Sequence, residues 1–248
     1  GENAVSGGFL AALLAGFVAG YLVLGIKKLA DKLPESMEGI KPVLIYPLFG
    51  VLLIGVFMFA VNPTMAAINT GITSFLNSMG GSSKILLGCI VAGMMSIDMG
   101  GPFNKAAYVF GTASIASGNY DVMAAVMIGG MIPPLAVALA TTFFKKKFTS
   151  EERKSGVVNY IMGLCFITEG VIPFAAADPL RVIPSCVAGS AVAGGLSMLF
   201  GCTLRAPHGG IFVFPVVGNV VGYLIALAAG SLVGMLLLGV LKKDKVAE

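Results

Sequence analysis

Long apolar runs that carry almost no charge constrain this chain more than any other feature. A helix that crosses a bilayer needs about 20 apolar residues. Five runs approach or exceed that length, near residues 5–26, 43–61, 122–144, 182–204 and 216–241. Of the 248 residues, 57% are hydrophobic and 11% are charged, whereas soluble domains carry about 25% charged residues. The sequence therefore predicts an all-α integral membrane protein, a polytopic helical bundle embedded in the lipid bilayer.

Several functional classes lack support in the sequence. The net charge of +4 does not indicate nucleic-acid binding, because the basic residues cluster beside the apolar runs. No P-loop, GxSxG or HExxH motif is present, so an ATPase, a hydrolase and a metalloprotease are unsupported. We expect no metal site and no disulfide framework, because the four cysteines have neither a CxxC spacing nor a metal-ligand spacing with the one histidine. We also expect no cofactor. These cysteines are Cys89, Cys165, Cys186 and Cys202.

The Lys/Arg clusters predict a topology. By the positive-inside rule, residues 27–41, 145–154 and 242–245 face the cytoplasm. The run at 43–61 then leads outward and the run at 122–144 leads inward, so the segment near 84–117 begins and ends outside. By the same count, the segment near 157–181 begins and ends inside. Both segments are short, apolar and broken by Gly, Pro and charge. We therefore expect two broken, re-entrant hairpins of opposite orientation, and broken helices of this kind point to the binding site of a transporter.

Three polar stretches interrupt the apolar sequence. A charge at membrane depth costs at least about 2.5–3.5 kcal/mol, so each charged residue there needs a partner, water or a role. The stretches are "DMGGPFNKAAYVFG" with Asp98, Asn104 and Lys105, "ITEGVIPFAAADPLRVIPS" with Thr168, Glu169, Asp178 and Arg181, and "RAPHGGIF" with His208. Carboxylate, amide and imidazole groups together suit a neutral ligand with many hydroxyl groups, such as a sugar.

Each of these residues also has a structural interpretation. Asp178 and Arg181 stand three positions apart and can neutralise one another, an alternative that the residues leave open. Asn104 can cap a helix, Lys105 can be an ordinary interface residue, and His208 can be a packed side chain. Glu169 lies between Gly and Pro without an adjacent cation, and the structural interpretation is weakest there.

The three stretches resemble the membrane-embedded IIC domain of the fructose family of bacterial phosphotransferase-system (PTS) permeases. The blocks "DMGGPFNKAAY", "TEGVIPFAAADPLRVIPS" and "APHGGIFV" look like the family's most distinctive motifs and occur in the same order. The run "GFLAALLAGFVAGYLVLGIKK" is similar to its mid-domain helix. The resemblance covers nearly the whole chain and implies a fold like that of the glucose superfamily, in which a substrate domain moves against a dimeric scaffold.

The resemblance also implies an activity. A IIC domain binds its sugar, here fructose or a related hexose, and translocates it across the bacterial cell membrane. A IIB phosphocysteine, recharged through IIA, phosphorylates the sugar. Glu169 matches the Glu of the superfamily motif that contacts the acceptor hydroxyl, which implies a catalytic role. Asp98, Asn104, Lys105, Thr168, Asp178, Arg181 and His208 are the expected substrate-binding residues.

The sequence departs from the family pattern in two respects. The family's N-terminal helices, expected to carry much of a homodimer contact, are missing, and the chain starts without Met like a piece of a longer protein. No IIA or IIB domain is present either, so we expect the phosphocysteine to come from other chains or from sequence beyond this one. The alternative function is a sugar facilitator or membrane sensor that binds sugar without phosphorylating it.

Overall fold

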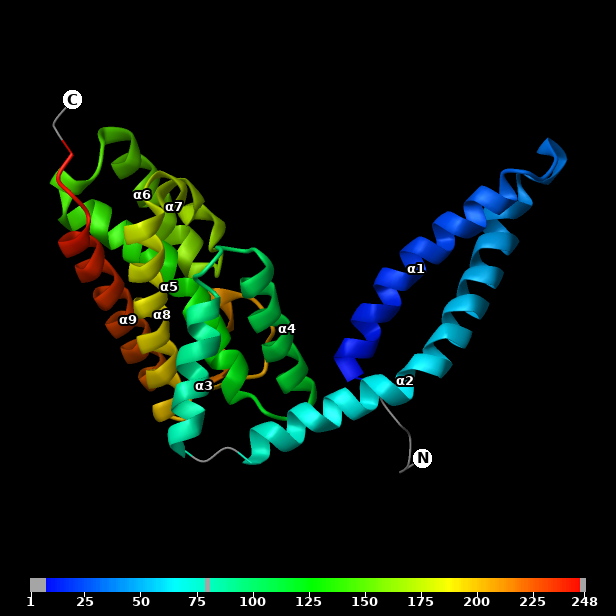
Figure 1. The fold of residues 1–248 in the computed structure, drawn as a ribbon, viewed down its shortest axis with the longest axis horizontal. Helices are drawn as coiled ribbons and strands as arrows, with labels where there is room; N and C mark the ends of the chain where they lie inside the picture. The colour runs from blue at the N-terminus through cyan, green and yellow to red at the C-terminus, as the bar shows by residue number, and fades with distance from the viewer. Residues whose placement is uncertain (1–7, 79–80, 246–248) are drawn as a thin grey trace. The chain divides into compact units, whose positions relative to one another are not determined.

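The computed structural model describes residues 8–78 and 81–245, which are mostly helical (Figure 1). The chain divides into two compact units, Gly1–Asn77 and Ser78–Glu248. Among the described residues, four helical segments are long and apolar enough to cross a membrane, namely Lys41–Ile68, Asp121–Phe143, Pro179–Leu199 and Val220–Leu241. The predicted all-α membrane fold is thereby confirmed, whereas the number and order of the crossings stay predictions.

The first unit consists of two long helices. They are α1 (Gly8–Ala30) and α2 (Tyr46–Ser78), joined through η1 (Glu35–Met37) and η2 (Lys41–Ile45). The predicted run at 5–26 falls on α1, except that residues 5–7 lie outside the described part of the chain. The second run was expected to end at Asn62–Pro63, and this was wrong, because α2 continues through Pro63 to Ser78. Figure 1 shows α2 bending along its length, as expected where proline removes a helical hydrogen bond.

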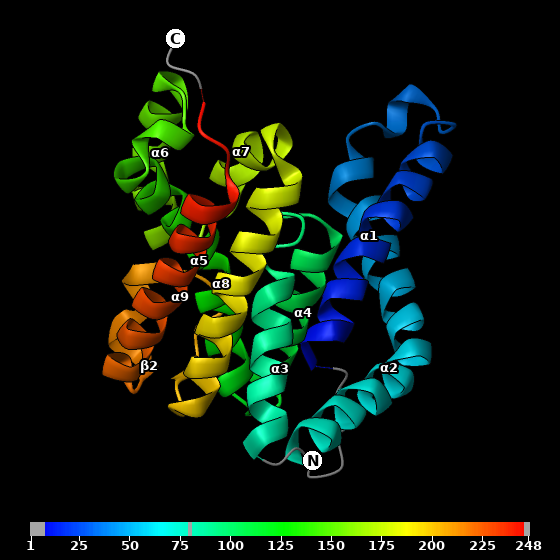
Figure 2. The same ribbon diagram turned by 60° about the vertical axis from the view of Figure 1, so that its left-hand side comes forward.

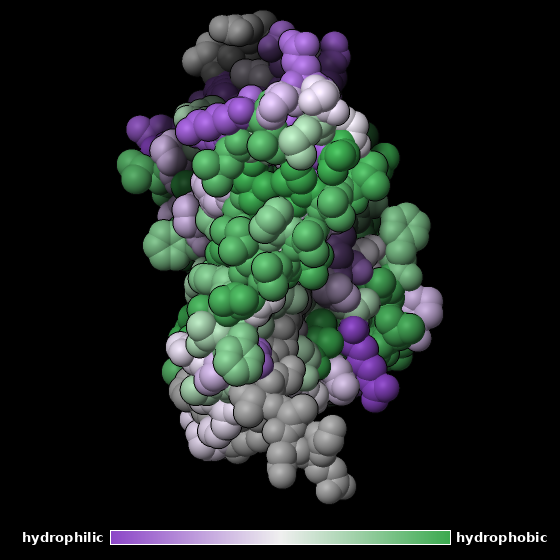
Figure 3. All heavy atoms as spheres, turned by 90° about the vertical axis from the view of Figure 1, so that its right-hand side faces the viewer, coloured by the Kyte–Doolittle hydropathy of each residue, from purple (hydrophilic) through white to green (hydrophobic). Residues whose placement is uncertain are grey.

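The surface of this unit is strongly apolar. None of the most apolar part of Lys41–Ile68 is buried within the chain, and Figure 3 shows a face dominated by hydrophobic side chains. Exposed examples are Phe17, Tyr21, Val43, Val51 and Phe59. Such a surface suits lipid, where apolar side chains need no protein cover.

The second unit is built around α5 (Asp121–Phe143), whose apolar stretch is 94% buried. The helices α3 (Gly81–Met94), α4 (Pro102–Ala116), α6 (Ser150–Leu164), α8 (Pro179–Leu199) and α9 (Val220–Leu241) contact it. Glycines allow the helices to approach closely, since a Cβ on Gly88 would lie 2.6 Å from the carbonyl oxygen of Gly194. Inside the bundle, the Ser190 hydroxyl donates to the Gly129 carbonyl oxygen at 2.8 Å and joins α8 to α5.

Two broken hairpins oppose one another in this unit (Figures 1 and 2). The helices α3 and α4 form the first, and its ends lie where α5 begins. The second runs from α6 through η4 (Glu169–Val171) to α7 (Ile172–Ala177), and its ends lie where α8 begins and α9 finishes. Whether these two hairpins are re-entrant from opposite sides of the membrane stays a prediction.

The remaining segments are short. They are η3 (Lys145–Lys147), β1 (Thr203–Leu204), η5 (Gly210–Val216) and β2 (Val217–Gly218). The strands β1 and β2 form a small antiparallel pair in which Thr203 faces Gly218. The expected run at 182–204 was therefore too long, because α8 ends at Leu199 and Gly201 follows with φ +63°. A glycine in the left-handed region just past a helix is a common stop.

Candidate functional site

The three polar stretches meet at one cavity of the second unit. Its volume is about 390 Å³, within the range of small-molecule sites, about 300–1,000 Å³. The first hairpin, the second hairpin and the loop before η5 all contribute. The lining residues are Met95, Asn104, Lys105, Tyr108, Phe166, Ile167, Thr168, Glu169 and His208. Five of the eight residues predicted for the site are therefore brought together, and Asp98, Asp178 and Arg181 are not among them.

Asp98 holds the start of α4. Its carboxylate accepts hydrogen bonds from the backbone N–H groups of Phe103 at 2.6 Å and Asn104 at 3.0 Å. These groups belong to the first turn of a helix and have no partner inside the helix. Asp98 thus caps α4, and a carboxylate is also favoured there by the helix dipole. Its contribution to the cavity is to fix the helix that carries Asn104 and Lys105.

Asn104 closes the first hairpin from inside. The residue is 3% exposed, and its Nδ2 donates to the Met95 carbonyl oxygen at 2.8 Å. This bond joins the beginning of α4 to the residue just after α3. No hydrogen bond to the amide oxygen of Asn104 is present in the described part of the chain, so that acceptor is left for a ligand.

The tip of the second hairpin carries Thr168 and Glu169 into the cavity. Thr168 is buried, at 4% exposure, and Glu169 begins η4. The Glu169 carboxylate lies against Gly100 of the first hairpin, since a Cβ on Gly100 would come to 2.8 Å from Glu169 Oε1. Gly100 has φ +110°, a conformation that favours glycine. The two hairpin tips therefore touch at the position of the predicted catalytic carboxylate.

His208 reaches the cavity from the third stretch. The backbone after it packs tightly on the end of α6, where Gly210, at φ +56°, lies against the Leu164 carbonyl oxygen. The ring centroid of His208 lies 5.1 Å from that of Phe166 and 6.3 Å from that of Tyr108. The imidazole is therefore held beside two aromatic rings that line the same cavity.

Sequence reasoning missed four lining residues: Met95, Tyr108, Phe166 and Ile167. Tyr108 could have been found, because it stands four residues after Asn104 and such pairs share a helix face. Phe166 gave no local signal. It adopts φ +63°, and its ring packs where a side chain on Gly130 of α5 would have to be.

Lys105 and Glu169 line the cavity with opposite charges and do not pair. Neither side chain forms an ion pair or a hydrogen bond to another described residue. The two come from different hairpins, so the cavity presents a cation and a carboxylate with no protein partner. A ligand that offers both hydroxyl donors and negatively charged oxygens would satisfy both.

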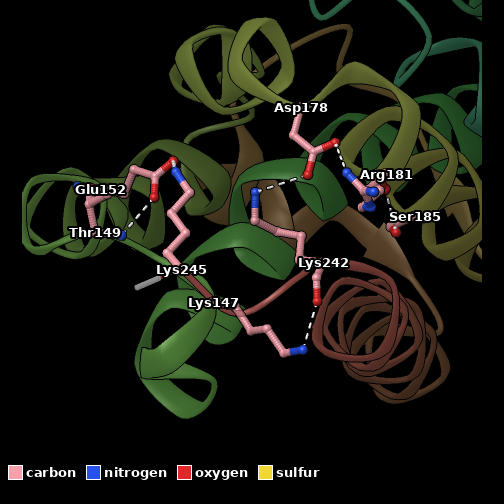
Figure 4. Close-up of polar contacts among 8 residues, drawn as sticks. All are labelled: Lys147, Thr149, Glu152, Asp178, Arg181, Ser185, Lys242 and Lys245. Carbon is pink, nitrogen blue, oxygen red and sulfur yellow. Dashed lines mark hydrogen bonds and ion pairs between the residues drawn. The ribbon is translucent and has the colours of Figure 1, made fainter. Parts of the chain in front are cut away.

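Asp178 and Arg181 belong to a separate cluster (Figure 4). Asp178 Oδ1 pairs with Arg181 Nη1 at 3.0 Å, and Asp178 Oδ2 pairs with Lys242 Nζ at 3.4 Å. Lys242 is only 2% exposed and stands over the Phe148 ring. This cluster fits the structural alternative left open by the sequence, in which Asp178 and Arg181 neutralise one another, with a third charge that the spacing did not reveal.

The same cluster attaches the segment after α9 to the connection between α5 and α6. Lys147 Nζ donates to the Lys242 carbonyl oxygen at 2.7 Å and pairs with Asp244 at 2.9 Å. Lys245 pairs with Glu152 at 2.8 Å, and Glu152 also completes a capping box with Thr149. Two basic segments that the positive-inside rule assigned to one side thus lie in contact.

These contacts alter the ionisation of two acidic groups. Burial raises the pKa of Glu152, but the hydrogen bonds from Lys245 and from the Thr149 backbone outweigh it, and the pKa is lowered overall. The hydrogen bond from Lys147 lowers the pKa of Asp244. Both carboxylates are therefore stabilised in their charged forms.

The described residues contain no group of three or more His, Cys, Asp or Glu side chains that could hold a metal ion. The four cysteines are free. The cavity therefore offers hydrogen-bonding groups, charges and aromatic rings as its means of binding.

A helical membrane protein whose cavity lies between the tips of two opposed broken hairpins has the architecture of a transport domain. The chain belongs to the family described as "Phosphotransferase system, EIIC", whose model matches residues 1–189. The family resemblance predicted from the three motifs is confirmed, and the protein is placed in the membrane.

Curated relatives agree with this assignment. The chain is 53% identical over 237 residues to the "PTS system fructose-specific EIIABC component" of Bacillus subtilis (strain 168), covering 95% of this chain and 37% of that protein. It is 53% identical to the "Fructose permease IIC component" of Bacillus amyloliquefaciens, covering 95% of this chain and 78% of that one. For the "PTS system fructose-specific EIIB'BC component" of Escherichia coli (strain K12), identity is 48%, covering 87% of this chain and 39% of that protein. The chain thus spans well under half of two of these relatives. No solved structure matches it significantly.

Proposed function

We propose that this chain forms the sugar-binding and translocating part of a fructose permease of the phosphotransferase system. The observation that carries the proposal is the meeting of Asn104, Lys105, Thr168, Glu169 and His208 at one cavity between opposed hairpin tips. The fructose-specific names of the relatives support fructose, or a related hexose, as the substrate.

The cavity chemistry suits a sugar. Hydroxyl groups both donate and accept hydrogen bonds, and the lining supplies a carboxylate, an amide oxygen, a hydroxyl and an imidazole. The Tyr108 and Phe166 rings, with centroids 6.4 Å apart, add apolar surface for the C–H face of a sugar ring. Polar groups at fixed positions in a partly aromatic pocket are typical of small-molecule sites.

In the proposed function, transport of the sugar is coupled to its phosphorylation. The donor is the phosphocysteine of a IIB partner, recharged through IIA, and the acceptor is a sugar hydroxyl held by Glu169. The carboxylate orients this hydroxyl and accepts its proton. The phosphotransferase activity belongs to the assembled system, in which this chain supplies the sugar site and IIB supplies the phosphoryl group. The family resemblance further suggests a homodimer in the bacterial cell membrane.

The test uses membranes that contain the complete permease. Equilibrium binding of radiolabelled fructose is measured beside sugar phosphorylation driven by phosphorylated IIB. We expect saturable fructose binding and IIB-dependent formation of sugar phosphate. Binding without phosphorylation would favour the facilitator or sensor, and absence of both would contradict the proposal.

A further inference from the structure

Lys105 is the lysine that lines the cavity, and it has no acidic partner in the described part of the chain. Elsewhere in the same unit, four lysines pair with carboxylates. Lys84 pairs with Asp121, Lys147 with Asp244, Lys242 with Asp178 and Lys245 with Glu152. Lys105 thus brings to the cavity a positive charge that no carboxylate of the described chain neutralises, and a charge in a membrane protein needs a partner, water or a role.

A neutral sugar does not require this cation. The acceptor and donor groups of Asn104, Thr168 and Glu169 already satisfy hydroxyls. Unlike those three side chains, an ammonium group carries a positive charge that attracts anions. Hydrogen bonds between charged groups are roughly twice as strong as those between neutral groups. The anion that enters the site in the proposed function is the phosphoryl group.

The start of α4 cannot serve as the anion site instead. A helix N-terminus binds phosphate through its free backbone N–H groups. Here the N–H groups of Phe103 and Asn104 both donate to the Asp98 carboxylate. The helix end is already occupied by a negative charge, and the Lys105 side chain is the group of this first turn that remains to meet an anion.

We propose that Lys105 binds the phosphoryl group during its transfer to the sugar, and is thus a second catalytic residue beside Glu169. This inference rests on the proposed function. In the transfer, the P–S bond of the IIB phosphocysteine breaks and its electron pair leaves with the thiolate sulfur. A bond forms between the sugar oxygen and phosphorus, and the hydroxyl proton passes to the Glu169 carboxylate. Lys105 neutralises charge on the non-bridging phosphoryl oxygens.

Two physical arguments support a role of Lys105 in phosphoryl transfer. Phosphoryl transfer has a loose transition state that gains little from covalent help and much from positioned positive charge. A cation preorganised at the site stabilises that charge without reorganisation. Lys105 and Glu169 approach from different hairpins, so the acceptor hydroxyl and the phosphoryl group can lie between them.

The experiment compares the affinities of the complete permease for fructose and for its phosphate esters, without IIB present. Fructose 1-phosphate and fructose 6-phosphate are assayed separately, with Lys105→Met, Lys105→Arg and the wild type. Loss of one charge-assisted hydrogen bond corresponds to about 10- to 100-fold in affinity. For Lys105→Met we expect such a loss for the phosphate ester that binds the wild type best, and less than about threefold for fructose. IIB-dependent phosphorylation should fall by a similar 10- to 100-fold factor, and Lys105→Arg should restore much of both.

Lys84→Met is the matched control. It also removes one lysine charge, but Lys84 pairs with Asp121 and does not line the cavity, so the ratio of the two affinities should not change. If Lys105→Met lowered the affinities for fructose and for fructose phosphate equally, the inference would be overturned. Lys105 would then be a sugar ligand or a structural residue. An unchanged affinity for the ester would also overturn the inference. A wild type that binds neither fructose nor its esters would contradict the proposed function itself, independently of Lys105.

Discussion

The Glu169 carboxylate lies against the backbone of Gly100, so that a methyl group at Gly100 would come within 2.8 Å of Glu169 Oε1. This relationship joins residues of two hairpins that return to opposite ends of the bundle. Because the candidate catalytic group sits at the point of contact, the position of either hairpin tip determines where the carboxylate stands in the cavity.

The first prediction concerns this contact. We expect Gly100→Ala to displace the Glu169 carboxylate and to weaken fructose binding by about tenfold or more, since small misplacements at a site have large effects. The substitution also places a side chain in a left-handed conformation, which costs about 1–2 kcal/mol. Fructose binding and thermal stability of the solubilised permease are measured together.

Gly118→Ala separates these two effects. Gly118 also has a positive φ, +79°, but a Cβ there would meet nothing within 4 Å. We expect this control to lose stability by about the same 1–2 kcal/mol and to keep its fructose affinity. If the two variants bound fructose equally well, the contact between Gly100 and Glu169 would have no part in the site.

The second prediction separates the two interpretations of Asp178. In Asp178→Asn, Lys242 loses its carboxylate while remaining buried, and removing one partner of a fully buried pair costs about 3–5 kcal/mol. We expect a clear fall in thermal stability with fructose affinity unchanged within about threefold, because Asp178 does not line the cavity. A large loss of fructose affinity at unchanged stability would instead support direct substrate contact.

The third prediction concerns pH and the segment 242–245. Contacts of Glu152 and Asp244 lower the pKa of each below its ordinary values of 4.5 and 3.8. Their contribution to attachment is therefore complete above about pH 4.5 and is lost as the pH falls through the lowered values. Backbone hydrogen exchange of 242–245, followed from pH 7 to pH 3, should accelerate beyond its intrinsic rate only in the acid part of that range.

Lys245→Met and Lys243→Met test the cause. Lys245 pairs with Glu152, whereas Lys243 is exposed and has no ion pair among the described residues. Removing Lys245 should raise exchange at neutral pH and flatten its pH dependence, and removing Lys243 should leave both unchanged. Identical behaviour of the two variants would show that the ion pair does not attach the segment.

The sequence was informative about the site where chemistry was concentrated in short motifs. Asn104, Lys105, Thr168, Glu169 and His208 were recognisable because polar residues stand out in apolar runs, and all of them line the cavity. The partner of Asp178 was not recognisable, because Lys242 lies 64 residues away and no local spacing connects them. Phe166 was missed for the same reason. The position of its ring depends on its own left-handed backbone and on the space left by the absent side chain of Gly130 in α5.

The ends of the helices were harder to predict than their existence. The existence of the long helices could be predicted from their apolar runs, but two of their ends were predicted wrongly. Pro63 was expected to end α2, yet proline is tolerated inside membrane helices and α2 passes through it. Gly201 does end α8, by adopting φ +63°, and this signal in "LFGCTL" was available but overlooked.

The central claim, that Glu169 serves the acceptor hydroxyl of a bound sugar, is tested most directly by Glu169→Gln in the complete permease. This change keeps the size and much of the hydrogen bonding of the side chain but removes its basicity. The measurement is the rate of fructose phosphorylation by phosphorylated IIB, beside equilibrium fructose binding to the same membranes. We predict a fall in rate of roughly 10²–10⁴-fold, with a much smaller loss of binding. Phosphorylation at the wild-type rate would contradict the account, and equal losses in rate and binding would reduce Glu169 to a sugar ligand.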